Sequence, residues 1–143
     1  IEGAAEGTGL GIQFLKHLQR TRLLLHLVDL VPLVPEEDPV TQVRLLENEL
    51  EKFDPGLLHK PRWLVFTKAD LLPAEEARER AAEAVAELGW SAPWSLISAA
   101  MKTGTAELMK RVSGELDRLV AEAAEDLDET RDGGRADPES GAP

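Results

Sequence analysis

The sequence predicts an α/β domain with a parallel sheet, because short apolar runs alternate along it with segments of helical period. The apolar runs are residues 23–29, 62–67 and 94–98, and an almost continuous apolar run is typical of a strand that is covered on both faces. Helical segments precede, separate and follow these three runs. This alternation is the order of a sheet whose parallel strands are joined by right-handed helical crossovers.

Four segments carry apolar residues at helical spacing: residues 11–20, 39–52, 74–88 and about 104–124. The second helix is expected to start at Pro39, because Asp38 suits the N-cap and proline suits the first helical position. Gly89 predicts the end of the third helix. The last helix is expected to bury an apolar stripe that consists of Leu108, Val112, Leu116, Leu119 and Val120.

A chain of 143 residues has the usual size of one domain, and 43% hydrophobic residues suffice for a modest core. We expect that domain to cover residues 1–125. Residues 126–143 are rich in Asp, Glu, Gly and Pro, and they are expected to form a disordered acidic tail that cannot bury enough apolar surface to fold. The chain opens on Ile1 and a glycine-rich segment, which suggests that it continues a larger protein.

The charge balance limits the classes of partner. The formal charge is −11, and more than half of it lies in residues 121–143, where eight acids stand against two arginines. This balance argues against DNA or anionic lipid as a partner, although a local basic patch could still exist. The sequence has no cysteine, no signal-like segment and no apolar run long enough to span a bilayer, so we expect a soluble cytoplasmic protein without a membrane partner. We also expect it to be a monomer.

The candidate site lies after the strands, because an open parallel sheet binds ligands outside the carboxyl ends of its strands. The segment after the second expected strand is Thr67-Lys68-Ala69-Asp70, and the segment after the third is Ser98-Ala99-Ala100. The pair resembles the base-recognition motifs NKxD and SAx of P-loop GTPases, with threonine where asparagine is more usual. A plain turn, with Asp70 as a cap and Lys68 in solvent, is the alternative interpretation of residues 67–70.

The residue types of these two segments suit the recognition of guanine. The Asp70 carboxylate could accept both N1–H and the 2-amino group of guanine in a charge-assisted contact that adenine cannot offer. Lys68 would lay its methylene stem along the base or the ribose, and the Ala99 N–H would donate to guanine O6. The small Ala100 lets the backbone come close, and the Ser98 hydroxyl can hold the loop.

Longer segments narrow the resemblance to one family. They are residues 1–11 (IEGAAEGTGLG), 14–17 (FLKH), 21–22 (TR), 49–52 (ELEK) and 60–66 (KPRWLVF). With the two motifs above, they resemble the GTP-binding domain of Obg-family GTPases over roughly residues 1–120, from just after its DxPGL motif. The resemblance implies the C-terminal part of a Ras-like P-loop GTPase domain, which is a three-layer α/β domain with a parallel sheet.

By this resemblance, the preceding part of the protein holds the Obg domain, the phosphate-binding loop, switch I, the DxPG motif of switch II and the ligands of Mg²⁺, whereas residues 1–125 of this chain include the switch II helix. The intact protein would bind GTP and GDP, hydrolyse GTP slowly, and act in assembly of the large ribosomal subunit and in growth and stress control. Hydrolysis would be slow because the family has a leucine where other GTPases use glutamine to orient water.

This chain alone is expected to be inactive, with neither catalytic residues nor metal ligands of its own. The pair Lys102–Thr103 is not part of a phosphate-binding loop, because Met101 stands where such a loop needs glycine.

Two alternatives stay open from the sequence. Another translation-associated P-loop GTPase could share the segments at residues 67–70 and 98–100. A non-catalytic α/β interaction module could keep the shape of the domain without binding a nucleotide, and protection of the intact protein against heat by guanine nucleotides would separate this module from an enzyme.

Overall fold

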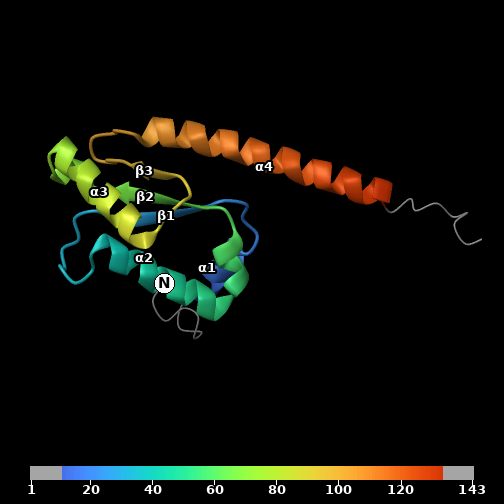
Figure 1. Cartoon of the computed structure of the whole chain (residues 1–143), viewed down its shortest axis with the longest axis horizontal. Helices are drawn as coiled ribbons and strands as arrows, with labels where there is room; N and C mark the ends of the chain where they lie inside the picture. Colours follow the sequence, from blue (N-terminus) through green and yellow to red (C-terminus); the bar gives the residue numbers. More distant parts are fainter. Residues whose placement is uncertain (1–10, 134–143) are drawn as a thin grey trace, which may run out of the picture. The chain divides into compact units, whose positions relative to one another are not determined.

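A computed structural model describes residues 11–133 of the chain, and Figure 1 shows the arrangement of their helices and strands. The elements are α1 (Gly11–Leu18), β1 (Leu24–Asp29), α2 (Pro39–Phe53), η2 (Pro55–His59), β2 (Arg62–Thr67), η3 (Ala69–Leu71), α3 (Ala74–Leu88), β3 (Trp94–Leu96) and α4 (Thr105–Gly133). The described residues thus form three strands, four α-helices and two short 3₁₀ helices. The predicted α/β class is confirmed.

The three strands form one parallel sheet in the order β1-β2-β3 (Figure 1). Residues 24–29 of β1 pair in register with residues 62–67 of β2, so Asp29 lies opposite Thr67 at the carboxyl end. The third strand ends earlier than predicted, at Leu96 instead of residue 98. Its backbone leaves the sheet because Ser98 pairs with Thr103 in an antiparallel bridge.

The main core lies between one face of the sheet and the helices α2 and α3. Its buried residues are Val28, Leu64 and Phe66 from the strands, Leu30 after β1, Val40 and Val43 from α2, and Ala77, Ala81 and Ala84 from α3. The alanines allow α3 to pack closely, and the rings of Phe66 and Trp94 form a T-shaped pair with 5.9 Å between their centroids. A second cluster of Leu15, Leu50 and Leu57 joins α1, α2 and η2.

The two faces of β1 differ, which corrects the expectation that this strand is covered on both. Successive side chains of a strand point to opposite faces. Leu24 and Val28 are buried on the face that α2 and α3 cover, but Leu27 on the other face is 62% exposed. The central strand β2 does meet the expectation, since its residues from Arg62 to Phe66 are all buried.

Capping residues set the helix ends as the sequence predicted. The Asp38 carboxylate accepts a hydrogen bond of 2.7 Å from the Thr41 N–H, and Pro39 follows at the first helical position of α2. At the end of α3, Gly89 adopts a left-handed conformation with φ of 62°. The predicted ends at Asp38 and Gly89 are therefore confirmed.

Helix α4 is longer than predicted, and it continues past residue 124 to Gly133. It takes up the first eight residues of the expected tail, 126–133, because residues 115–132 contain no glycine or proline that would end a helix. The other tail residues, 134–143, lie outside the described residues. Within residues 11–133, no helix is both long and apolar enough to cross a membrane.

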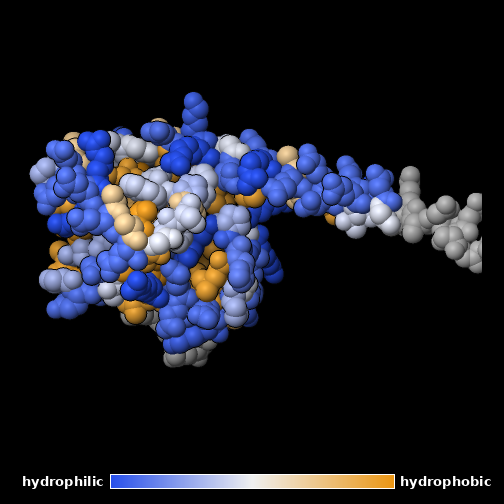
Figure 2. Space-filling model, viewed as in Figure 1, coloured by the Kyte–Doolittle hydropathy of each residue, from blue (hydrophilic) through white to orange (hydrophobic). Residues whose placement is uncertain are grey.

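The apolar stripe expected along α4 is buried only at its first residue, Leu108. Leu116 and Val120 are exposed, and Val112 and Leu119 are partly exposed. The periodicity of a helix shows which face is apolar, but burial also requires a surface to pack against. Among the described residues, 11–108 and 109–133 belong to two different compact units, and Figure 2 shows the C-terminal half of α4 as mostly hydrophilic.

Candidate functional site

The carboxyl ends of the strands bring the two predicted segments together. Ile97, directly after β3, donates its N–H to the carbonyl of Phe66 at 2.8 Å. The Ala69 N–H in turn donates to the Ile97 carbonyl at 3.1 Å. Residues 67–70 and 98–100 therefore leave the sheet side by side, and Ala69 contributes through its backbone while its side chain packs against the core.

A hydrogen bond between side chains joins the two segments. The Ser98 hydroxyl donates to Oδ1 of Asp70 at 2.7 Å, and the Met101 N–H donates to the Ser98 oxygen at 3.1 Å. Ser98 is buried whereas Asp70 is exposed. Within residues 11–133, Oδ2 of Asp70 makes no hydrogen bond. Asp70 is thus held by one carboxylate oxygen and offers the other to an external donor.

Residues 98–104 form a tight loop that presents backbone N–H groups. Ser98 and Thr103 exchange two backbone hydrogen bonds of 3.0 Å, which close the loop at its base. Ala99 and Ala100 are exposed at its tip, and their N–H groups donate to no residue between 11 and 133. The N–H groups of the tip are therefore available to an acceptor outside the described residues.

Gly104 allows the loop to return toward the sheet. It has a φ of 77°, and a Cβ at this position would lie 2.8 Å from the Leu96 carbonyl oxygen. Gly89 has a similar φ of 62°, but a Cβ there would meet nothing within 4 Å. The two glycines therefore have a similar backbone conformation, but only Gly104 lacks space for a side chain.

Replacing Gly104 by alanine is expected to destabilise the protein by about 2 kcal/mol, of which about half is backbone strain and the rest the clash. Gly89→Ala should cost only about 1 kcal/mol, because strain acts there without a clash. Urea unfolding of both variants measures the difference. Equal losses in the two variants would show that the contact with Leu96 does not constrain the loop.

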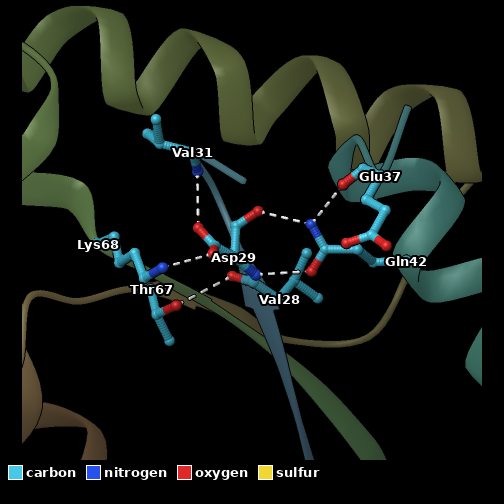
Figure 3. Close-up of polar contacts among 7 residues, drawn as sticks. All are labelled: Val28, Asp29, Val31, Glu37, Gln42, Thr67 and Lys68. Atoms are coloured by element: carbon cyan, nitrogen blue, oxygen red, sulfur yellow. Dashed lines mark hydrogen bonds and ion pairs between the residues drawn. The ribbon is translucent and has the colours of Figure 1, made fainter. Parts of the chain in front are cut away.

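Lys68 directly follows β2, and its side chain reaches the end of the neighbouring strand β1. Its backbone is left-handed, with a φ of 64°, and its ammonium group lies 2.6 Å from Oδ2 of Asp29 (Figure 3). The Lys68 side chain remains 48% exposed and that of Asp29 26% exposed. Both groups therefore remain accessible, and their ion pair is a contact that neither interpretation of residues 67–70 included.

Asp29 is a site residue that the sequence analysis missed. Figure 3 shows its carboxylate between Lys68 and Val31, whose N–H donates to Oδ1 at 2.9 Å. Gln42 of α2 holds the backbone of Asp29 with hydrogen bonds of 2.9 and 2.8 Å to its N–H and carbonyl. The signal that could have revealed Asp29 is its position, since it too is the last residue of a parallel strand.

Thr67 occupies the position where the resemblance expects asparagine. Its carbonyl accepts from the Leu30 N–H at 3.2 Å, and its hydroxyl lies 3.4 Å from the Val28 carbonyl (Figure 3). The hydroxyl therefore ties the end of β2 to β1.

The site is open at the surface. Two cavities of about 420 and 260 Å³ are lined by other residues, the larger by the segment 30–40 together with α3. Among residues 11–133, no three His, Cys, Asp or Glu side chains are grouped so that they could hold a metal ion. A comparison of the sequence with known protein families gives no match.

Proposed function

We propose that this chain forms the guanine-reading part of the GTP-binding domain of an Obg-type GTPase. The observation that carries the proposal is the hydrogen bond from Ser98 to Asp70, because it joins the two segments that resemble base-recognition motifs. Adjacent parallel strands end at these segments, which is where open α/β sheets bind their ligands.

The Asp70 carboxylate accepts N1–H and the 2-amino group of guanine in this proposal. Oδ2 is free among the described residues, and Oδ1 keeps acceptor capacity beside its bond to Ser98, because a carboxylate oxygen accepts more than one hydrogen bond. Adenine carries no hydrogen on N1 and would leave the carboxylate unpaired, which costs about 1 to 3 kcal/mol or more for a charged group.

The exposed loop and Lys68 complete the contacts with the base. The N–H of Ala99 or Ala100 donates to guanine O6, and the small side chains let the base approach the backbone. The Lys68 stem lies along the base or the ribose, since an amphipathic side chain can contact an apolar ring surface while its charge stays in polar surroundings.

The intact protein, in this proposal, includes a preceding segment that binds the phosphates and supplies the ligands of Mg²⁺, as the Obg resemblance implies. GTP and GDP are its ligands, and hydrolysis of GTP is slow. The large ribosomal subunit is the proposed partner, and the cytoplasm the proposed location. The residues of this chain bind and orient the base, and they take no part in the bond-breaking step.

Calorimetric titration of the intact protein with GDP, XDP and ADP tests the proposal. GDP is expected to bind at least a hundredfold more tightly than ADP, because ADP leaves the charged Asp70 carboxylate without its two donors, a loss of about 3 kcal/mol. Equal affinities would refute guanine recognition. If the intact protein bound none of the three nucleotides, the result would instead favour the alternative that the chain is a non-catalytic interaction module that binds no nucleotide.

A further inference from the structure

The end of β1 is held more firmly than an ordinary strand end. Asp29 uses its backbone N–H and carbonyl to bind the Gln42 side chain, and Gln42 also donates to the Glu37 carbonyl at 2.8 Å. Asp29 Oδ1 accepts from the Val31 N–H (Figure 3). Gln42 thus fixes the backbone of Asp29 and the Val31 N–H holds Oδ1, so Oδ2 presents a defined negative charge to Lys68.

Lys68 meets this charge through an uncommon backbone conformation. A left-handed conformation is unfavourable for a residue with a Cβ, and such residues are frequent at ligand sites. Here the conformation turns the side chain from the end of β2 toward the end of β1, where the ammonium group reaches Asp29 at 2.6 Å. The stem between these two fixed ends remains partly exposed.

We propose that Asp29 is a positioning residue of the nucleotide site, which orders Lys68 so that its stem is ready to support the base or the ribose. The inference rests on the proposed function of residues 67–70. A free lysine side chain loses much rotational freedom when it is ordered by a ligand, and a side chain that is already ordered loses less. Asp29 therefore strengthens binding without touching the nucleotide.

Removal of the Asp29 charge changes GDP affinity in opposite directions if Asp29 positions Lys68 and if it acts only by electrostatic repulsion. A nucleotide is an anion, so a nearby carboxylate repels it and removal of that carboxylate alone should tighten binding. Positioning predicts the opposite result. Asp29→Asn keeps an oxygen for the Val31 N–H and keeps both backbone bonds to Gln42, while it removes the charge that holds Lys68.

Asp29→Asn in the intact protein is expected to weaken GDP binding about fivefold, which is the upper range for an exposed ion pair. Glu36→Gln is the matched control, because Glu36 is an exposed acid on the next loop with no hydrogen bond to residues 11–133. Its GDP affinity should stay unchanged or rise. Tighter GDP binding by Asp29→Asn would overturn the proposal.

A double-mutant cycle tests whether Asp29 acts through Lys68. Lys68→Met keeps an unbranched stem but removes the ammonium group, so Asp29→Asn should have no further effect on GDP affinity in that background. An equal loss in both backgrounds would contradict the positioning role. Asp29→Glu keeps the charge and should bind GDP more tightly than Asp29→Asn does, and it serves as the test variant if the asparagine variant unfolds.

The same titrations distinguish this inference from the proposed function. If Asp29 only positions Lys68, the preference of Asp29→Asn for GDP over XDP should equal that of the wild type, because Asp70 is untouched. A wild-type protein without preference for GDP would refute the proposed function itself. A normal preference with unchanged or tighter GDP binding by Asp29→Asn would refute only the role of Asp29.

Discussion

Replacement of Asp70 by asparagine in the intact protein is expected to weaken GDP binding about a hundredfold and to strengthen XDP binding. Xanthine carries an oxygen where guanine has its 2-amino group. The variant loses a charge-assisted hydrogen bond to guanine. It also places the asparagine NH₂ group, a donor, against the 2-amino group of guanine, which is a donor too, and the two effects together cost about 3 kcal/mol. GDP and XDP affinities of both proteins, measured by calorimetry, test this reversal of preference.

The contact with Ser98 determines which atom of the substituted asparagine would face the base. The Met101 N–H donates to the Ser98 oxygen, so the Ser98 hydroxyl hydrogen is available for the side chain at position 70. The asparagine oxygen is expected to accept that hydrogen as Oδ1 of Asp70 does, which places the amide NH₂ where Oδ2 now lies. The NH₂ group then donates to the xanthine oxygen.

Asp70→Ala is the control for this reversal. It removes the carboxylate without supplying a donor, so it should lose GDP affinity and gain none for XDP. If Asp70→Asn leaves GDP binding intact and gains nothing for XDP, then Asp70 does not read the base. In that case the assignment of guanine to this site would be wrong.

Local sequence signals predicted most of the secondary structure. The bounds of β2 and α3 agree with the expected ranges. A continuous apolar run marks β2, and Gly89 marks the end of α3. The strand β3 is shorter than its apolar run, since the Ser98–Thr103 pairing bends the chain. The end of α4 and the burial of its stripe could not be predicted from periodicity, because both depend on what surrounds the helix.

The sequence predicted that the two segments of the candidate site lie next to each other, and the structure places them side by side. The sequence placed residues 67–70 and 98–100 at the same edge of a parallel sheet, but it did not predict the hydrogen bond between Ser98 and Asp70. The position of Asp29 at the end of a parallel strand was available from the sequence, but its contact with Lys68 was not, because that contact depends on the left-handed backbone at the lysine. The same holds for Gln42, a residue of α2 whose side chain reaches the end of β1.

A buried histidine lies on the core face of β1, three residues before Asp29. His26 is 5% exposed, and its Nδ1 lies 3.3 Å from a guanidinium nitrogen of Arg62. Arg62 also pairs with Glu47 at 3.4 Å and stacks over the Trp90 ring at 5.0 Å. Burial, together with the nearby charge of Arg62, lowers the pKa of His26 from 6.5 to about 4.

The protein is expected to lose about 3 kcal/mol of stability as the pH falls from 6.5 to 4, through His26 alone. The folded state keeps this imidazole neutral, whereas the unfolded chain binds a proton near pH 6.5. The contribution is therefore complete above pH 6.5 and is lost toward pH 4, because the unfolded state then binds more protons.

Urea unfolding at several pH values, followed by tryptophan fluorescence, measures this dependence in the wild type and in two variants. The glutamine of His26→Gln cannot bind a proton. The free energy of unfolding of this variant should therefore fall about 3 kcal/mol less than that of the wild type between pH 6.5 and 4, even if the variant is less stable at neutral pH. His59→Gln changes an exposed histidine and should keep the full dependence of the wild type. A His26→Gln variant with the same pH dependence as the wild type would show that His26 is not the group that couples folding to protonation.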